Sequence, residues 1–91
     1  MLVALEEMKQ YLRVDFADDD SLIEYLLFSA EKICMDIMRT DDESRLTSEP
    51  NAKTAVLYTV AYLYEHREDA DHHALMITLR ALLFGSRQEG F

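Results

Sequence analysis

Apolar residues recur at helical spacing in three stretches of the chain and cover nearly every side of a fourth. From about Asp19 to Arg39 they follow the i, i+3, i+4, i+7 rule, which predicts one long amphipathic helix. Residues 4–13 and 75–84 show shorter forms of the same pattern. Residues 52–67 are apolar almost all round, as is typical of a helix surrounded by protein. The pattern predicts a small all-α, four-helix domain with one long helix, a central apolar helix and a short C-terminal helix.

The connecting segments are polar. The acidic run Asp18–Asp20 is expected to supply the N-cap of the long helix and to place its other carboxylates at the positive end of the helix dipole. Residues 40–49 and 68–73 are predicted to be a loop and a turn, and Pro50 to occupy the first turn of the central helix. Gly85 is a stop signal, so the tail at about 85–91 is expected to be mobile.

Length and composition limit the fold and the kinds of partner that the chain can have. A chain of 91 residues predicts a single domain over 1–91, and two Gly and one Pro are too few for the turns of an all-β fold. There is neither a signal peptide nor a membrane-spanning run, which predicts a protein that is intracellular where it is made and that has no membrane partner. The net charge of −9, from 18 acidic and 9 basic residues, disfavours a surface that grips nucleic acid.

Catalytic and metal chemistry have little support in the sequence. Cys34, the single cysteine, falls on the apolar face of the long helix, where a buried thiol is expected. Adjacent histidines on a helix diverge by roughly 100°, so the one metal-like cluster predicts a polar turn and no metal site. We predict no catalytic residue, no cofactor and no sequence-specific DNA binding. The metal-like cluster consists of His66, Asp69, Asp71, His72 and His73.

Two groups of apolar side chains are candidates for contacts with partners. Phe28 and Met35 lie on the outer, charged face of the long helix beside Glu24, Glu31, Lys32 and Arg39, with Tyr25 near its edge. Tyr58 and Tyr62 lie on the side of the central helix away from its most apolar stripe. The central helix can be read as a core helix with tyrosine hydroxyls in solvent or as a helix that also meets another subunit.

The order of these motifs resembles the head–tail connector family of long-tailed bacteriophages. Residues 4–15, ALEEMKQYLRVD, look like its opening signature, and residues 18–30 look like its acidic cap and Leu-rich helix. Residues 50–67 are similar to its third helix, which begins at a Pro and closes on Tyr-Glu-His-Arg. The closing Leu82-Leu83 and Arg87 also match. The family often has a turn with Pro and Gly before the last helix, where this chain has DADHHA.

The resemblance implies a non-enzymatic virion structural protein. Such proteins form a ring of about a dozen copies with closed cyclic symmetry at the head–tail junction, between portal and tail. The ring completes the head after DNA packaging, and DNA passes through it only as cargo. The implied partners are the chain itself, the portal, and head-completion or tail proteins, with synthesis in the bacterial host cytoplasm. The expected subunit contacts are Tyr25, Phe28, Met35, Tyr58, Tyr62, Arg67, Arg80 and Arg87.

A second hypothesis is a small acidic regulatory protein, or a DNA mimic, that binds a single protein partner. Mimicry of DNA requires carboxylates at phosphate-like spacing on one exposed face. Here the acids gather instead at loops and helix starts, in Asp18–Asp20, Asp41–Glu43 and Glu68–Asp71. This distribution favours the connector hypothesis.

Overall fold

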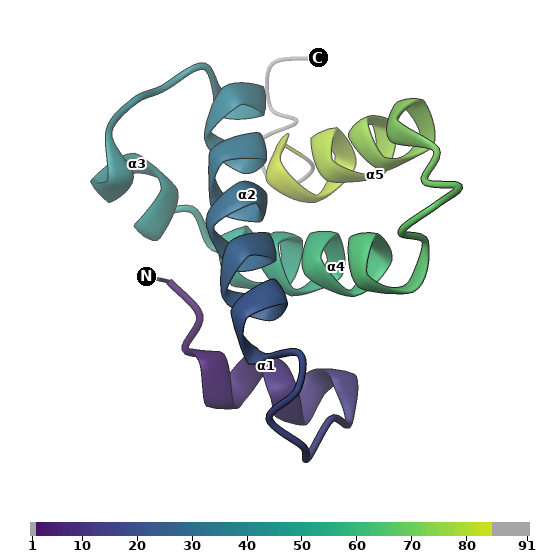
Figure 1. Cartoon of the computed structure of the whole chain (residues 1–91). Helices are drawn as coiled ribbons and strands as arrows, with labels where there is room; N and C mark the ends of the chain where they lie inside the picture. The colour runs from purple at the N-terminus through teal and green to yellow at the C-terminus, as the bar shows by residue number, and fades with distance from the viewer. Residues whose placement is uncertain (1, 85–91) are drawn as a thin grey trace.

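The computed structural model describes residues 2–84, which form five helices and no strand. In Figure 1, α2 stands upright, α4 crosses behind it, α1 lies below α4 and α5 above it. The all-α class predicted from the sequence is confirmed, but the described chain has five helices and not four. Their bounds are α1 Leu5–Leu12, α2 Asp20–Met38, α3 Glu43–Thr47, α4 Ala52–Glu65 and α5 His72–Phe84.

The buried side chains form one cluster around the crossing of α2 and α4. Leu27 of α2 and Val56 and Val60 of α4 are fully buried there, and α5 adds Leu79. The predicted inner face of α2 is confirmed, because the most deeply buried residues of this helix recur at three- and four-residue intervals. The fully buried positions on α2 are Ile23, Leu27, Ala30 and Cys34.

Helices α1 and α2 both end in an arginine with a left-handed backbone conformation. Arg13 has φ 62° and Arg39 has φ 58°, at positions where glycine is the commonest residue. The next residue closes each helix end with a backbone hydrogen bond. The Val14 N–H donates to the carbonyl of Lys9, and the Thr40 N–H donates to the carbonyl of Met35. The chain therefore ends two helices sharply without a glycine.

The segment predicted as the 40–49 loop contains α3. Asp42 is its N-cap, and its carboxylate accepts hydrogen bonds from the Ser44 amide at 3.0 Å and the Ser44 hydroxyl at 2.7 Å. These bonds hold the pKa of Asp42 below its usual value. Leu46 is buried and attaches α3 to the core. The sequence predicted Pro50 in the first turn of α4. Pro50 instead precedes Asn51, the N-cap residue of this helix.

The acidic run before α2 is used for tertiary contacts. Asp19 is the N-cap residue, as expected from the run, but its side chain makes no capping bond. Its carboxylate instead accepts a hydrogen bond from the Tyr64 hydroxyl, which raises the pKa of Tyr64. Asp20 forms an ion pair with Lys9 at 2.7 Å. The two contacts join the start of α2 to α4 and to α1.

The N-terminal segment is held by a buried acid. Glu31 was predicted on the outer face of α2, but its residue is only 7% exposed and its carboxyl oxygen accepts the Leu2 N–H at 2.7 Å. Val3, next in the chain, is fully buried. Residues 2–4 therefore cover this side of α2 before α1 begins.

Helix α5 starts earlier than the predicted residue 75. His72 and His73 form its first turn, and Asp71 caps it by accepting the Ala74 N–H at 3.0 Å. Helix α5 buries Leu75 and Leu79. None of the helices in the described range is long and apolar enough to cross a membrane.

Candidate interaction surfaces

Two aromatic side chains project from the outer face of α2. Tyr25 and Phe28 are 67% and 69% exposed, the two highest values among the large exposed apolar residues. They are three residues apart and therefore neighbours on the helix surface. Glu24 and Lys32 lie four residues to either side of Phe28. We call Tyr25 and Phe28 the α2 knob.

A groove lies between α1 and α4, which run in the same direction, one below the other (Figure 1). Its volume is about 660 Å³. One wall comes from the end of α1 and the other from the second half of α4. We call it the α1–α4 groove; its lining residues are Tyr11, Leu12, Arg13, Tyr58, Ala61, Tyr62, Glu65 and His66.

The α4 wall of the groove is a stack of three rings. Tyr58 stacks on Tyr62 with centroids 6.3 Å apart, and Tyr62 stacks on His66 at 4.3 Å. The Tyr62 hydroxyl accepts the Asp71 N–H at 2.7 Å, and His66 Nδ1 lies 3.0 Å from the Tyr62 carbonyl oxygen. The Tyr62 ring is held by a stacked ring on either side and by the bond to its hydroxyl, so the centre of this wall is preorganised for a contact.

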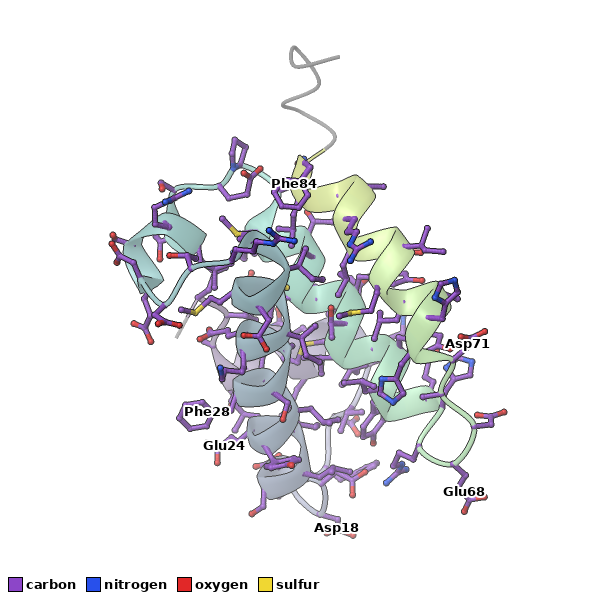
Figure 2. The ribbon with its side chains drawn as sticks, turned by 90° about the horizontal axis from the view of Figure 1, so that it is seen from above. Asp18, Glu24, Phe28, Glu68, Asp71 and Phe84 are labelled. Atoms are coloured by element: carbon purple, nitrogen blue, oxygen red, sulfur yellow. The ribbon has the colours of Figure 1, made fainter. Side chains whose placement is uncertain are left out.

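The knob and the groove lie on different sides of the molecule. In Figure 2, Phe28 and Asp71 lie on opposite sides of the molecule, and the Asp71 amide is bonded to the Tyr62 hydroxyl in the groove. A subunit that contacts one neighbour on each side needs two different surfaces in this arrangement.

The other predicted contact residues do not join the α2 knob or the α1–α4 groove. Met35 is half-buried and packs against the core, so it does not extend the exposed face of α2 as predicted. Arg67 lies with its guanidinium carbon 5.0 Å from the centroid of the Tyr64 ring. Arg80 is exposed on α5, and Arg87 and the 85–91 tail lie outside the described residues. The structure brings together only Tyr25 with Phe28, and Tyr58 with Tyr62.

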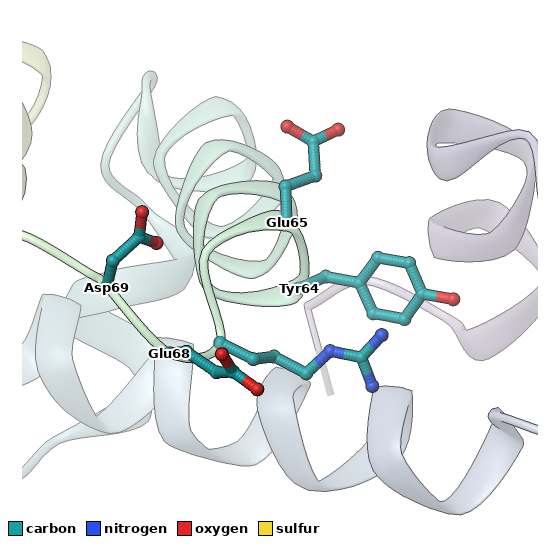
Figure 3. A pocket seen from close by; sticks show the side chains of 5 residues that line it. Tyr64, Glu65, Glu68 and Asp69 are labelled. Atoms are coloured by element: carbon teal, nitrogen blue, oxygen red, sulfur yellow. The ribbon is translucent and has the colours of Figure 1, made fainter.

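A second hollow, of about 650 Å³, lies at the end of α4 and is lined by Tyr64, Arg67 and three acids (Figure 3). Figure 3 shows Glu65 pointing to the opposite side from Glu68, with Asp69 on the far side of the turn. Within residues 2–84, no three His, Cys, Asp or Glu side chains come together as a metal site requires. The histidines of the predicted polar turn are divided between α4's C-cap and the first turn of α5.

Sequence reasoning did not identify Tyr11 or Ile77 as exposed apolar residues. Tyr11 is 52% exposed and lines the groove, and Ile77 is 55% exposed on α5. Tyr11 follows the buried Met8 by three residues, a spacing that also fits a core position. Its exposure depends on the angle between α1 and α4, which the periodicity of α1 does not specify.

The fold and its two opposed aromatic surfaces define a small all-α protein with surfaces suited to protein contacts. The family model described as phage gp6-like head-tail connector protein matches residues 3–80. The chain belongs to this family, which is structural rather than enzymatic and whose members are components of phage virions. Neither the comparison with curated proteins nor the comparison with solved structures found a match.

Proposed function

We propose that this chain is the repeating subunit of a closed ring between the portal and the tail of a long-tailed bacteriophage. The ring completes the head after DNA packaging, gives the tail a docking surface and lets DNA pass through its centre. The match of the connector family over residues 3–80 carries the proposal. Residues 1–91 act as one connector domain, and the portal and the head-completion or tail proteins are its partners.

The exposed surfaces support this role. Each subunit of a cyclic ring uses two different, complementary patches, one for each neighbour. The α2 knob and the α1–α4 groove are two such patches on opposite sides of the chain. Exposed aromatic clusters of this kind are typical of protein contact sites.

The distribution of charge supports passage of DNA. Asp18 and Glu68 project at the same end of the molecule in Figure 2, and the bond between Tyr64 and Asp19 ties the two acidic segments together. We assign this acidic end to the central hole. Carboxylates there repel DNA phosphates, so the genome slides past without binding.

Native mass spectrometry over a concentration series tests the ring. The expected result is a discrete species of about a dozen subunits with cyclic symmetry, and negative-stain images of it should show a central hole. If the chain stays monomeric alone, it is expected to form the same species on a portal ring. A monomer that binds neither itself nor the portal contradicts the proposal and favours the acidic regulatory protein.

Reversing the charge of Arg67 is expected to weaken assembly without unfolding the chain. Arg67 is exposed, and its one described contact is with the Tyr64 ring, so Arg67→Glu removes a surface interaction of about 0.5–1 kcal/mol. A negative charge at this position opposes pairing with acids of the next subunit. The measurement is native mass spectrometry beside circular dichroism, with Arg80→Glu as a second variant. Ring formation equal to wild type would exclude Arg67 from the interface.

A further inference from the structure

We propose that the α2 knob of one copy enters the α1–α4 groove of the next copy, with α2 lying across the groove. The inference rests on the proposed ring and specifies its subunit contact. An apolar projection that matches a pocket elsewhere on the same chain produces a head-to-tail contact, which closes into a ring when the rotation permits. The knob and groove satisfy this condition because they lie on opposite sides of the chain.

The groove has room and chemistry for the knob. Its volume is about 660 Å³, whereas a cavity of roughly 150 Å³ already holds a benzene ring. The stacked rings of Tyr58 and Tyr62 offer flat and edge contacts to an entering aromatic ring. Ala61 lies between them in the sequence and leaves space in the wall. Both rings of Tyr25 and Phe28 can therefore be buried in this groove.

Charge complementarity fixes the orientation. Glu24 and Lys32 lie on either side of Phe28 along α2, roughly 12 Å apart at the rise of an α-helix. The groove has Arg13 on its α1 wall and Glu65 on its α4 wall. Within residues 2–84, neither Glu24 nor Arg13 forms an ion pair. The contact therefore places Glu24 against Arg13, and Lys32, which pairs with Asp36 of its own chain at 3.3 Å, on the side of Glu65.

Disulfide cross-linking of the full-length chain tests the contact. The native Cys34 does not interfere, because its side chain is fully buried and burial raises the pKa of its thiol to about 11. The variants are Lys32→Cys, one helical turn from Phe28, and Ala61→Cys in the groove; both sites are at least partly exposed, and both rings of the knob are kept. Ile77→Cys, on an exposed apolar position of α5, is the matched control.

Mixing the Lys32→Cys and Ala61→Cys chains under mild oxidation is expected to shift the monomer to a covalent dimer. A chain with both substitutions is expected to give a ladder of higher oligomers. Neither single variant alone should cross-link more than Ile77→Cys. The proposal is overturned if Lys32→Cys pairs mainly with itself, which indicates a two-fold contact, or if Ala61→Cys reacts equally with Ile77→Cys.

The orientation is tested by exchanging charges. Glu24→Arg or Arg13→Glu alone is expected to reduce the cross-link between Lys32→Cys and Ala61→Cys, and combining them across the contact is expected to restore it. Loss without restoration excludes the assigned orientation. Rings in native mass spectra without the knob–groove cross-link would overturn this contact and leave the ring proposal standing. The cross-link without rings would support this contact and overturn the ring proposal.

Discussion

Replacing Leu27 with alanine is expected to lower the free energy of unfolding by about 2–5 kcal/mol. Leu27 is fully buried on α2, the helix that α4 crosses at the centre of the core. Removing its side chain loses the transfer free energy of the buried atoms and leaves a cavity that the two crossed helices can fill only in part. A domain of this size has about 5–15 kcal/mol of stability in total, so the loss is large.

Phe28→Ala is the matched control, because it lies one residue further along the same helix and is 69% exposed. An exposed substitution of this kind changes stability by about 0.5 kcal/mol or less. Urea unfolding followed by circular dichroism at low protein concentration separates the two variants. Leu27→Ala should shift the midpoint strongly, whereas Phe28→Ala should leave folding intact and impair assembly. Equal midpoints would contradict the assignment of the two faces of α2.

The apolar pattern predicted α2 and most of its buried face, because its period follows directly from helix geometry. The positions of Leu27 and Val60 could be assigned in this way. The short helix α3 could not, because only Leu46 in its five residues is buried and its start depends on the local bond from Ser44 to Asp42. One buried apolar position is too few to show the helical period from which a helix is predicted.

The surfaces were predicted only in part. Tyr25 and Phe28 stand out in sequence because they interrupt a charged face. The groove does not, since its walls come from α1 and α4, which are distant in sequence and meet only in the fold. The same reason explains why the Asp19 side chain makes no capping bond: it accepts a hydrogen bond from Tyr64, which is 45 residues away in the sequence.

Glu31 shows this limit most clearly. Its place on the helical wheel puts it on the charged outer face of α2, beside Phe28 and Lys32. It is nevertheless buried, because residues 2–4 fold back over this part of the helix and donate the Leu2 N–H to its carboxyl oxygen. A buried polar group of this kind is retained at low cost only while its partner is present.

Replacing Glu31 with alanine is therefore expected to destabilise the chain by about 1–3 kcal/mol. The Leu2 N–H loses its acceptor, and the segment that buries Val3 loosens from α2. Glu31→Gln keeps an oxygen that can accept the same bond, so its loss should be smaller. Glu24→Ala, one heptad earlier and exposed, is the matched control and should unfold close to wild type.

Urea unfolding gives the order of stability, and hydrogen exchange of the Val3 amide reports on the N-terminal segment directly. The expected order is Glu24→Ala, then Glu31→Gln, then Glu31→Ala as the least stable. Exchange at Val3 should accelerate with the Glu31 substitutions alone, because only these remove the contact with Leu2. If Glu31→Ala and Glu24→Ala unfold alike, residues 2–4 are not anchored through Glu31, and Val3 must hold the segment by apolar burial alone.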